Sequence, residues 1–120
     1  MTTLFDTESV SLYNNLISVF KISSSDITNV PLLREIGKRK KHVLLSTGAS
    51  NIDEIKFAIN KLDLPDKKIC IMHCVLNYPT KDENANLLQI ENLKKKFPKN
   101  LIGYSDHTEP NKDLLALSIA

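Results

Sequence analysis

Short apolar runs alternate with longer amphipathic segments along the whole chain. The apolar runs are continuous rather than alternating in polarity, which is typical of strands covered on both faces. We therefore predict four strands, at residues 19–23, 43–46, 68–74 and 101–104. The amphipathic segments between them predict helices after Asp6, from about Asn29, from Ser50-Asn51, over residues 84–96 and from about Asn111.

Strands and helices that alternate through short links indicate right-handed βαβ units and a parallel sheet. Each predicted strand is followed directly by polar residues. These stretches are Ser23-Ser24-Ser25-Asp26, Ser46-Thr47-Gly48, Asn77-Tyr78-Pro79-Thr80 and Ser105-Asp106-His107-Thr108. Parallel α/β folds carry their chemistry at these strand ends. The absence of Gly-x-Gly-x-x-Gly after any strand favours a partial (β/α)8 barrel of about four to five βα units over a dinucleotide-binding sheet.

Composition narrows the class of partner. The 120 residues suffice for one domain, and their net charge of +2 gives no reason to expect nucleic acid or a membrane surface. No apolar run approaches the ~20 residues of a membrane span, and residues 1–6 lack the features of a secretory signal. Cys70 and Cys74 would lie ~13 Å apart on a strand, too far for a disulfide, so a reducing, cytoplasmic setting fits.

Three positions carry candidate chemistry. Lys21 lies inside an apolar strand, near Ser24 and Asp26. We favour an anion-binding role for it over the alternative, in which a lysine on an edge strand only prevents pairing with another strand. Gly48, after Ser46-Thr47, lets the backbone approach an anion, although such turns often only cap helices. His107 is a metal or acid/base candidate, and its spacing alone leaves a metal ligand and a solvated loop residue equally open.

Four stretches taken together resemble the sialic-acid synthase family. They are residues 20–33 (Phe-Lys-Ile-Ser-Ser-Ser-Asp onward), 45–48 (Leu-Ser-Thr-Gly), 73–80 (His-Cys-Val-Leu-Asn-Tyr-Pro-Thr) and 103–108 (Gly-Tyr-Ser-Asp-His-Thr). They occur in the family's order and approximate spacing over essentially the whole chain. The resemblance implies a TIM barrel that condenses phosphoenolpyruvate with an N-acetylmannosamine-type sugar and releases phosphate, with Mn²⁺ or Mg²⁺.

The resemblance also assigns roles to individual residues. Lys21, Ser24 and Ser46 would hold phosphoenolpyruvate, with Thr3 near its carboxylate. Asp26, where the family often has Glu, would be catalytic. Tyr78 would line the sugar pocket and act in catalysis, and His107 would be one of two histidine metal ligands. A homodimer of the full-length parent is left open.

The sequence also departs from the family. Ser25 replaces a usual glycine, Leu76 a polar residue and Leu4 a proline. We expect residues 1–120 to be a partial barrel domain that lacks the opening strands, the final strands and the antifreeze-like domain, and to be inactive alone. The alternative is a non-catalytic remnant or interaction module of a split or truncated gene.

Overall fold

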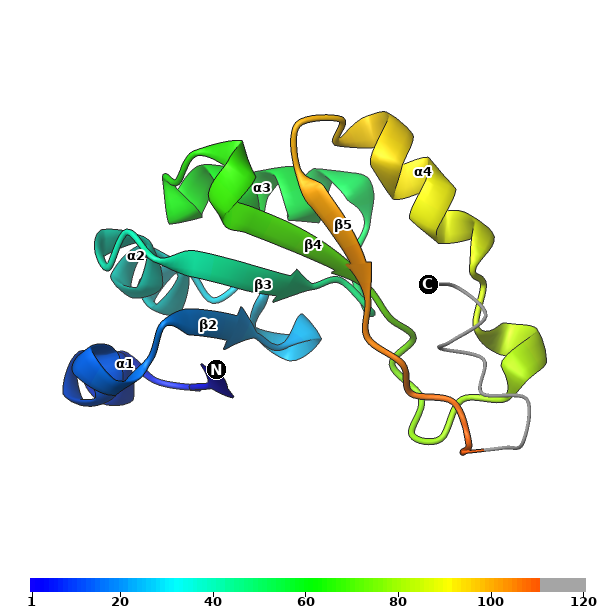
Figure 1. Cartoon of the computed structure of the whole chain (residues 1–120), viewed down its shortest axis with the longest axis horizontal. Coiled ribbons are helices and arrows are strands. Elements are labelled where there is room, and N and C mark those ends of the chain that lie inside the picture. The colour runs from blue at the N-terminus through cyan, green and yellow to red at the C-terminus, as the bar shows by residue number, and fades with distance from the viewer. Residues whose placement is uncertain (111–120) are drawn as a thin grey trace.

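A computed structural model of the chain describes residues 1–110, in which five parallel strands alternate with helices (Figure 1). The strands are β1 (Thr2–Thr3), β2 (Val19–Ile22), β3 (His42–Ser46), β4 (Ile69–His73) and β5 (Leu101–Tyr104). The α-helices are α1 (Thr7–Tyr13), α2 (Val30–Lys38), α3 (Ile52–Leu62) and α4 (Leu88–Lys96). Short 3-10 turns are η1 (Asn14–Leu16), η2 (Ser24–Asp26), η3 (Asp66–Lys68) and η4 (Asp82–Asn84).

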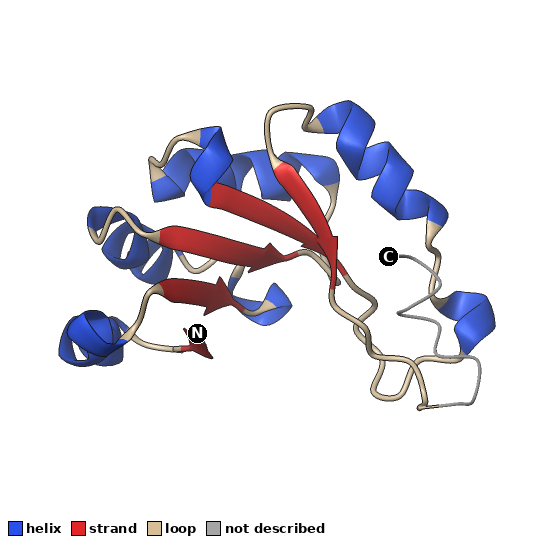
Figure 2. Ribbon diagram, in the orientation of Figure 1, coloured by secondary structure: helices blue, strands red, loops and turns tan. Residues whose placement is uncertain are grey.

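The strands form one sheet in the order β1-β2-β3-β4-β5, and every neighbouring pair is parallel. The helices lie along the outer side of this sheet (Figure 2), as in a segment of a (β/α) barrel. The predicted fold class and the four predicted strands are therefore confirmed. The strand β1 was not predicted, because two threonines give no apolar run.

Capping residues in the sequence fix where three helices begin. The Asp6 side chain accepts from the Ser9 N–H at 2.7 Å before α1, and the Asn29 side chain accepts from the Leu32 N–H at 3.3 Å before α2. Asn51 and Glu54 form a complete capping box at α3. The fourth helix was predicted from residue 84 but begins at Leu88. The 3-10 turn η4 precedes it, and Asn86 has a φ of 49°, which a helix does not allow. The helix predicted from Asn111 lies outside the described residues.

The two faces of the sheet differ in chemistry. The outer face packs on the helices and is apolar, with all of its central side chains at most 1% exposed; these are Phe20, Ile22, Val43, Leu45, Ile69 and Ile71. The opposite face, which we call the inner face, carries the alternate residues of each strand. They are Thr3, Val19, Lys21, His42, Leu44, Ser46, Cys70, Met72, Leu101 and Gly103. The inner face is therefore the more polar side.

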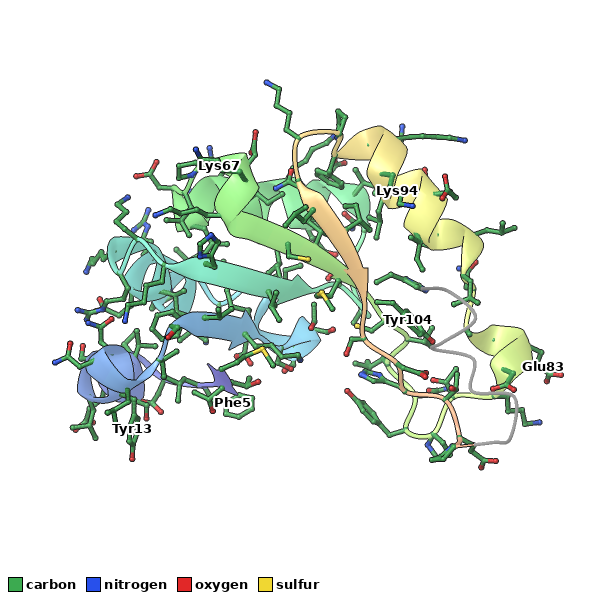
Figure 3. The ribbon with its side chains drawn as sticks, viewed as in Figure 1. Phe5, Tyr13, Lys67, Glu83, Lys94 and Tyr104 are labelled. Carbon is green, nitrogen blue, oxygen red and sulfur yellow. The ribbon has the colours of Figure 1, made fainter. Side chains whose placement is uncertain are left out.

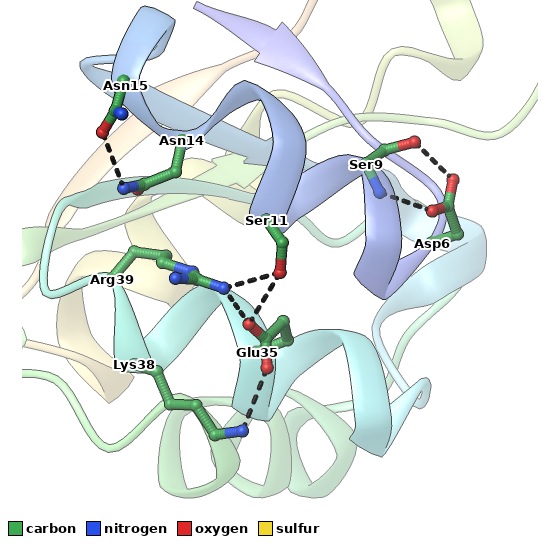
Figure 4. Close-up of polar contacts among 8 residues, drawn as sticks. All are labelled: Asp6, Ser9, Ser11, Asn14, Asn15, Glu35, Lys38 and Arg39. Atoms are coloured by element: carbon green, nitrogen blue, oxygen red, sulfur yellow. Dashed lines mark hydrogen bonds and ion pairs between the residues drawn. The ribbon is translucent and has the colours of Figure 1, made fainter.

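Helices α1 and α2 are joined by a polar cluster on the surface (Figure 4). Glu35 pairs with Lys38 at 3.0 Å and also with the Arg39 guanidinium. Arg39 donates to the hydroxyl of Ser11 on α1 at 2.8 Å.

No helix within residues 1–110 is long and apolar enough to cross a bilayer.

Candidate active site

The residues predicted for the site lie at one edge of the sheet. Parallel strands bring their carboxyl ends to a common edge, and each candidate lies near such an end. Thr3 and Ser46 are the last residues of β1 and β3, and Lys21 is the next-to-last residue of β2. The remaining candidates follow the ends of β2, β4 and β5; they are Ser24, Asp26, Tyr78 and His107.

Thr3 and Lys21 are direct neighbours across the sheet. They are register partners in the β1–β2 ladder, so both side chains leave the inner face side by side. Both are half-buried. Ser46 leaves the same face one strand further on, because Lys21 pairs with Leu44 and Ser46 lies two residues beyond it. The register thus gathers three of the predicted substrate-binding residues on the inner face.

Two of these residues have polar groups without partners. Lys21 makes no ion pair, hydrogen bond or ring contact within residues 1–110, although its side chain leaves the inner face of a sheet. Ser46 is 2% exposed, and its hydroxyl oxygen has no hydrogen-bond partner among the described atoms. A half-buried cation and an unpaired buried hydroxyl both carry a free-energy cost that a bound anion would relieve.

Ser24 joins the ends of three strands. Its Oγ accepts a hydrogen bond from the Gly48 N–H at 2.9 Å and lies 3.3 Å from the thiol of Cys74. A Cβ at position 48 would meet Cys74 Sγ at 2.9 Å and Ser24 Oγ at 3.1 Å, so the glycine allows this approach. Both Ser24 and Cys74 are buried. The sequence indicated only that Gly48 lets the backbone approach an anion, and the contacts of Gly48 and Cys74 with Ser24 were not predicted.

Asp26 lies at the end of the turn η2 and is held by local contacts. One carboxylate oxygen accepts from the Ser25 hydroxyl at 3.3 Å and the other from the Asn29 amide at 3.4 Å. Within the described residues these are its only polar side-chain partners, and none comes from another strand end. The structure therefore places Asp26 near Ser24 in the chain but does not join it to Lys21.

Tyr78 and His107 form a second group at the same edge. The Tyr78 hydroxyl is 2.9 Å from His107 Nε2, and the two ring centroids are 3.9 Å apart. The other imidazole nitrogen, Nδ1, is hydrogen-bonded to the carbonyl oxygen of Val75. Val75 follows Cys74, so this backbone step links the Tyr78–His107 pair to the Ser24 group. Tyr78 and His107 are 29 positions apart in the sequence, and no sequence signal predicted their contact.

The Val75 carbonyl decides which nitrogen of His107 is basic. A carbonyl only accepts, so Nδ1 carries the proton and the neutral ring presents the Nε2 lone pair. This is the arrangement of a metal-binding histidine oriented by a backbone acceptor. His107 thus fits a divalent metal as one ligand, although residues 1–110 contain no group of three His, Cys, Asp or Glu side chains placed to hold an ion.

Tyr104, labelled in Figure 3, ends β5 just before the loop that carries His107, and its hydroxyl bonds Asp106 in that loop. Hydrogen bonds from the Thr108 N–H and hydroxyl lower the pKa of Asp106, with smaller help from the Tyr104 hydroxyl. Burial, followed by the hydrogen bond to Asp106, raises the pKa of Tyr104 to about 12. The loop therefore keeps a charged carboxylate and a neutral phenol at neutral pH.

His73 and the two cysteines do not form a metal site. His73 is buried on the outer face, where its Nε2 contacts the Ala85 carbonyl at 2.8 Å and its ring stacks on Tyr104. Cys70 lies on the inner face, and Cys74 lies just past the strand; both are free thiols. His73 and Cys70 therefore point to opposite faces of β4.

Comparison with known proteins decides the family. A model of the NeuB family matches residues 1–119. The chain belongs to the NeuB family. As a NeuB-family chain it is 43% identical over 112 residues to the N,N'-diacetyllegionaminic acid synthase of Campylobacter jejuni, covering 90% of this chain and 33% of that protein. It therefore spans about a third of the length of the curated relatives it matches.

Solved NeuB-family relatives share the fold. The N-acetylneuraminic acid synthetase of Leptospira borgpetersenii, solved with citrate, superposes with a TM-score of 0.86 at 32% identity, covering 98% of this chain and 42% of that chain. The spore coat polysaccharide biosynthesis protein SpsE of Bacillus subtilis superposes with a TM-score of 0.85 at 34% identity, covering 91% of this chain and 31% of that chain. The resemblance inferred from the sequence is confirmed, and with it the partial barrel.

Proposed function

We propose that this chain supplies the phosphoenolpyruvate side of a nonulosonic-acid synthase site. In that reaction phosphoenolpyruvate condenses with an N-acetylmannosamine-type sugar and phosphate is released. Relatives named as synthases of legionaminic, sialic and pseudaminic acids support this assignment. Because the chain spans about a third of those relatives, the proposal includes further strands that complete the barrel around it.

One observation carries the proposal: within residues 1–110 Lys21 has no counter-charge, and the hydroxyl of Ser46 on the same face has no hydrogen-bond partner. Phosphoenolpyruvate carries about three negative charges, which a lysine and aligned hydroxyl donors can offset. Thr3, the register partner of Lys21, adds a third donor on the same side. Lys21 is half-buried without a partner among the described residues, and an anionic ligand would relieve the cost of that position.

The other candidates take roles around this core. Ser24 would contribute its hydroxyl if it exchanged the Gly48 N–H and Cys74 thiol for the ligand. Asp26 and Tyr78 would act in catalysis, Asp26 as a carboxylate beside the phosphoenolpyruvate site. Tyr78 would also line the sugar pocket, for which its 74% exposure leaves the phenol accessible.

A divalent metal, Mn²⁺ or Mg²⁺, belongs to the proposal, with His107 Nε2 as one ligand. When bound, such an ion can polarise the sugar aldehyde as a Lewis acid. The support for this role is the Nδ1 contact to Val75, which leaves Nε2 as the basic nitrogen. We also place the protein in the reducing cytoplasm, in keeping with two free thiols, and leave a homodimer of the completed enzyme as part of the proposal.

Binding of phosphoenolpyruvate by the purified chain, followed by calorimetry and by ³¹P line broadening, tests the proposal. Lys21→Ala should weaken binding about ten- to a hundredfold, the range expected for a lost charge-assisted hydrogen bond. Lys67→Ala is the matched control, because Lys67 is exposed on η3 before β4, at the opposite end of the sheet. Equal binding by wild type, Lys21→Ala and Lys67→Ala would contradict the assigned site.

A further inference from the structure

We propose that Tyr78 is a displaceable blocking group for His107. Its phenol occupies Nε2, the imidazole nitrogen through which His107 would bind a metal, and must swing away before that nitrogen can be used. The reference to a metal rests on the proposed function; the blocking contact itself does not.

The blocking contact has two parts. The Tyr78 hydroxyl lies 2.9 Å from Nε2, and because Nδ1 holds the proton against Val75, the phenol is the donor to the Nε2 lone pair. The phenol ring also lies against the imidazole, with centroids 3.9 Å apart and planes tilted by 31°. Ser105 Oγ, at 3.4 Å from the same nitrogen, is a more distant second neighbour. A ligand that approaches Nε2 therefore meets the phenol first.

His107 is fixed, whereas Tyr78 is not. The His107 carbonyl accepts from the Thr80 N–H at 2.7 Å, and Thr80 forms a parallel bridge to Thr108. Thr80 is 1% exposed, so this anchor is buried. Tyr78 is 74% exposed, and within residues 1–110 its side chain has no other polar or ring partner than His107. The phenol can thus rotate into solvent without disturbing the anchor of the imidazole.

The accessibility of Nε2 can be measured without any metal. Diethyl pyrocarbonate acylates unprotonated imidazole nitrogens, and mass spectrometry follows each histidine separately. Tyr78→Phe keeps the ring but removes the donor, so His107 should react about two- to tenfold faster, the range for one net hydrogen bond. Tyr78→Ala also removes the ring and should react faster still.

Two other histidines serve as internal standards in the same samples. His42 is exposed and reports the reagent, whereas buried His73, bonded to Ala85, reports whether the fold has loosened. Tyr104→Phe is the matched control, because it deletes the phenol hydroxyl at the end of β5, which bonds Asp106 and not His107. Unchanged His107 reactivity in both Tyr78 variants, or an equal acceleration in Tyr104→Phe, would overturn the proposal.

Mn²⁺ binding, measured by the electron paramagnetic resonance signal of the free ion, separates this proposal from the proposed function. Tyr78→Phe should bind Mn²⁺ about two- to tenfold more tightly than wild type. Faster acylation with no Mn²⁺ binding in any variant would support the blocking role and count against a metal at His107. Tighter Mn²⁺ binding by wild type than by Tyr78→Phe would contradict the blocking role.

Discussion

The backbone N–H of Gly48 donates to the hydroxyl of Ser24 at 2.9 Å, so the loop after β3 is tied to the turn after β2. The hydrogen bond holds together the segments that follow β2 and β3, the two strands that carry Lys21 and Ser46 on the inner face. It depends on a residue without a side chain at position 48, because a Cβ there would press on both Ser24 and Cys74.

Gly48→Ala should therefore destabilise the fold. The new methyl group would lie 2.9 Å from Cys74 Sγ and 3.1 Å from Ser24 Oγ, and relieving such overpacking typically costs about 1–3 kcal/mol. Urea unfolding followed by circular dichroism measures the change. The neighbouring Ala49→Ser, at an exposed position, should stay within about 0.5 kcal/mol of wild type. Equal stabilities for the two variants would show that the loop accommodates the methyl group freely.

Gly37→Ala tests the close packing of α2 on α3. A Cβ at position 37 would lie 2.0 Å from the carbonyl oxygen of Leu62, which is backbone and cannot rotate away. The loss should exceed about 1 kcal/mol, even though alanine has the higher helix propensity by about that amount. Lys38→Ala, exposed on the next position of α2, is the control for helix propensity. A Gly37→Ala protein as stable as Lys38→Ala would argue against this helix contact.

Lys21→Ala should change stability little. Lys21 has no ion pair or hydrogen bond among the described residues, so its removal takes away a half-buried, unpaired charge rather than a polar contact. We expect the free energy of unfolding to stay within about 0.5–1 kcal/mol of wild type, or to rise. Thermal unfolding measures this in the absence of phosphoenolpyruvate. A loss of several kcal/mol would make Lys21 a structural residue of the sheet.

Acid should weaken the link between α1 and α2. Hydrogen bonding to Lys38, together with the charges of Lys38 and Arg39, lowers the folded-state pKa of Glu35 below its ordinary value of 4.5. A lowered folded pKa gives stability that is present above pH 4.5 and is lost as the pH falls through the folded pKa. The stability of Glu35→Gln should accordingly converge with that of wild type as the pH drops below about 4.5. A constant difference between the two proteins from pH 7 to pH 2 would exclude Glu35 as the titrating group.

Tyr104 should lose its phenol proton only at unusually high pH. Its pKa is raised to about 12 from an ordinary value of 10.0, so the neutral phenol is the favoured form in the folded protein. The stability contributed by this phenol is present below pH 10 and declines as the pH rises from 10 towards 12. Absorbance at 295 nm should show a tyrosine ionising well above pH 10, and Tyr104→Phe should remove that step. The same titration curve above pH 10 for wild type and Tyr104→Phe would contradict this environment.

Much of the fold was predictable from the sequence, because its signals are local. Apolar runs such as the one ending at Ser46 predict buried parallel strands, and Asp6, Asn29 and Asn51 mark helix starts through short-range capping bonds. The strand β1 was not predicted, because two residues are too few to show a pattern of apolar and polar positions. The start of α4 was placed too early because nothing in residues 84–88 signals the intervening turn.

The site was predictable only in its composition. Strand ends identify which polar residues share one edge, but contacts between distant residues depend on the register and the loops. No sequence pattern indicated that Tyr78 would cover His107 or that Cys74 would contact Ser24, because each pair joins two separate loops. The catalytic and binding roles assigned by resemblance remain predictions.

Phosphate release by a completed barrel tests the central claim most directly. In the chimera this chain replaces the 43%-identical segment of the Campylobacter jejuni synthase, and phosphate release is followed with phosphoenolpyruvate, an N-acetylmannosamine-type sugar and Mn²⁺. We expect the chimera to release phosphate only when both substrates are present, and Lys21→Ala to lower kcat/KM for phosphoenolpyruvate at least about tenfold relative to Lys67→Ala. A folded chimera that releases no phosphate, or one in which Lys21→Ala behaves like Lys67→Ala, would contradict the account.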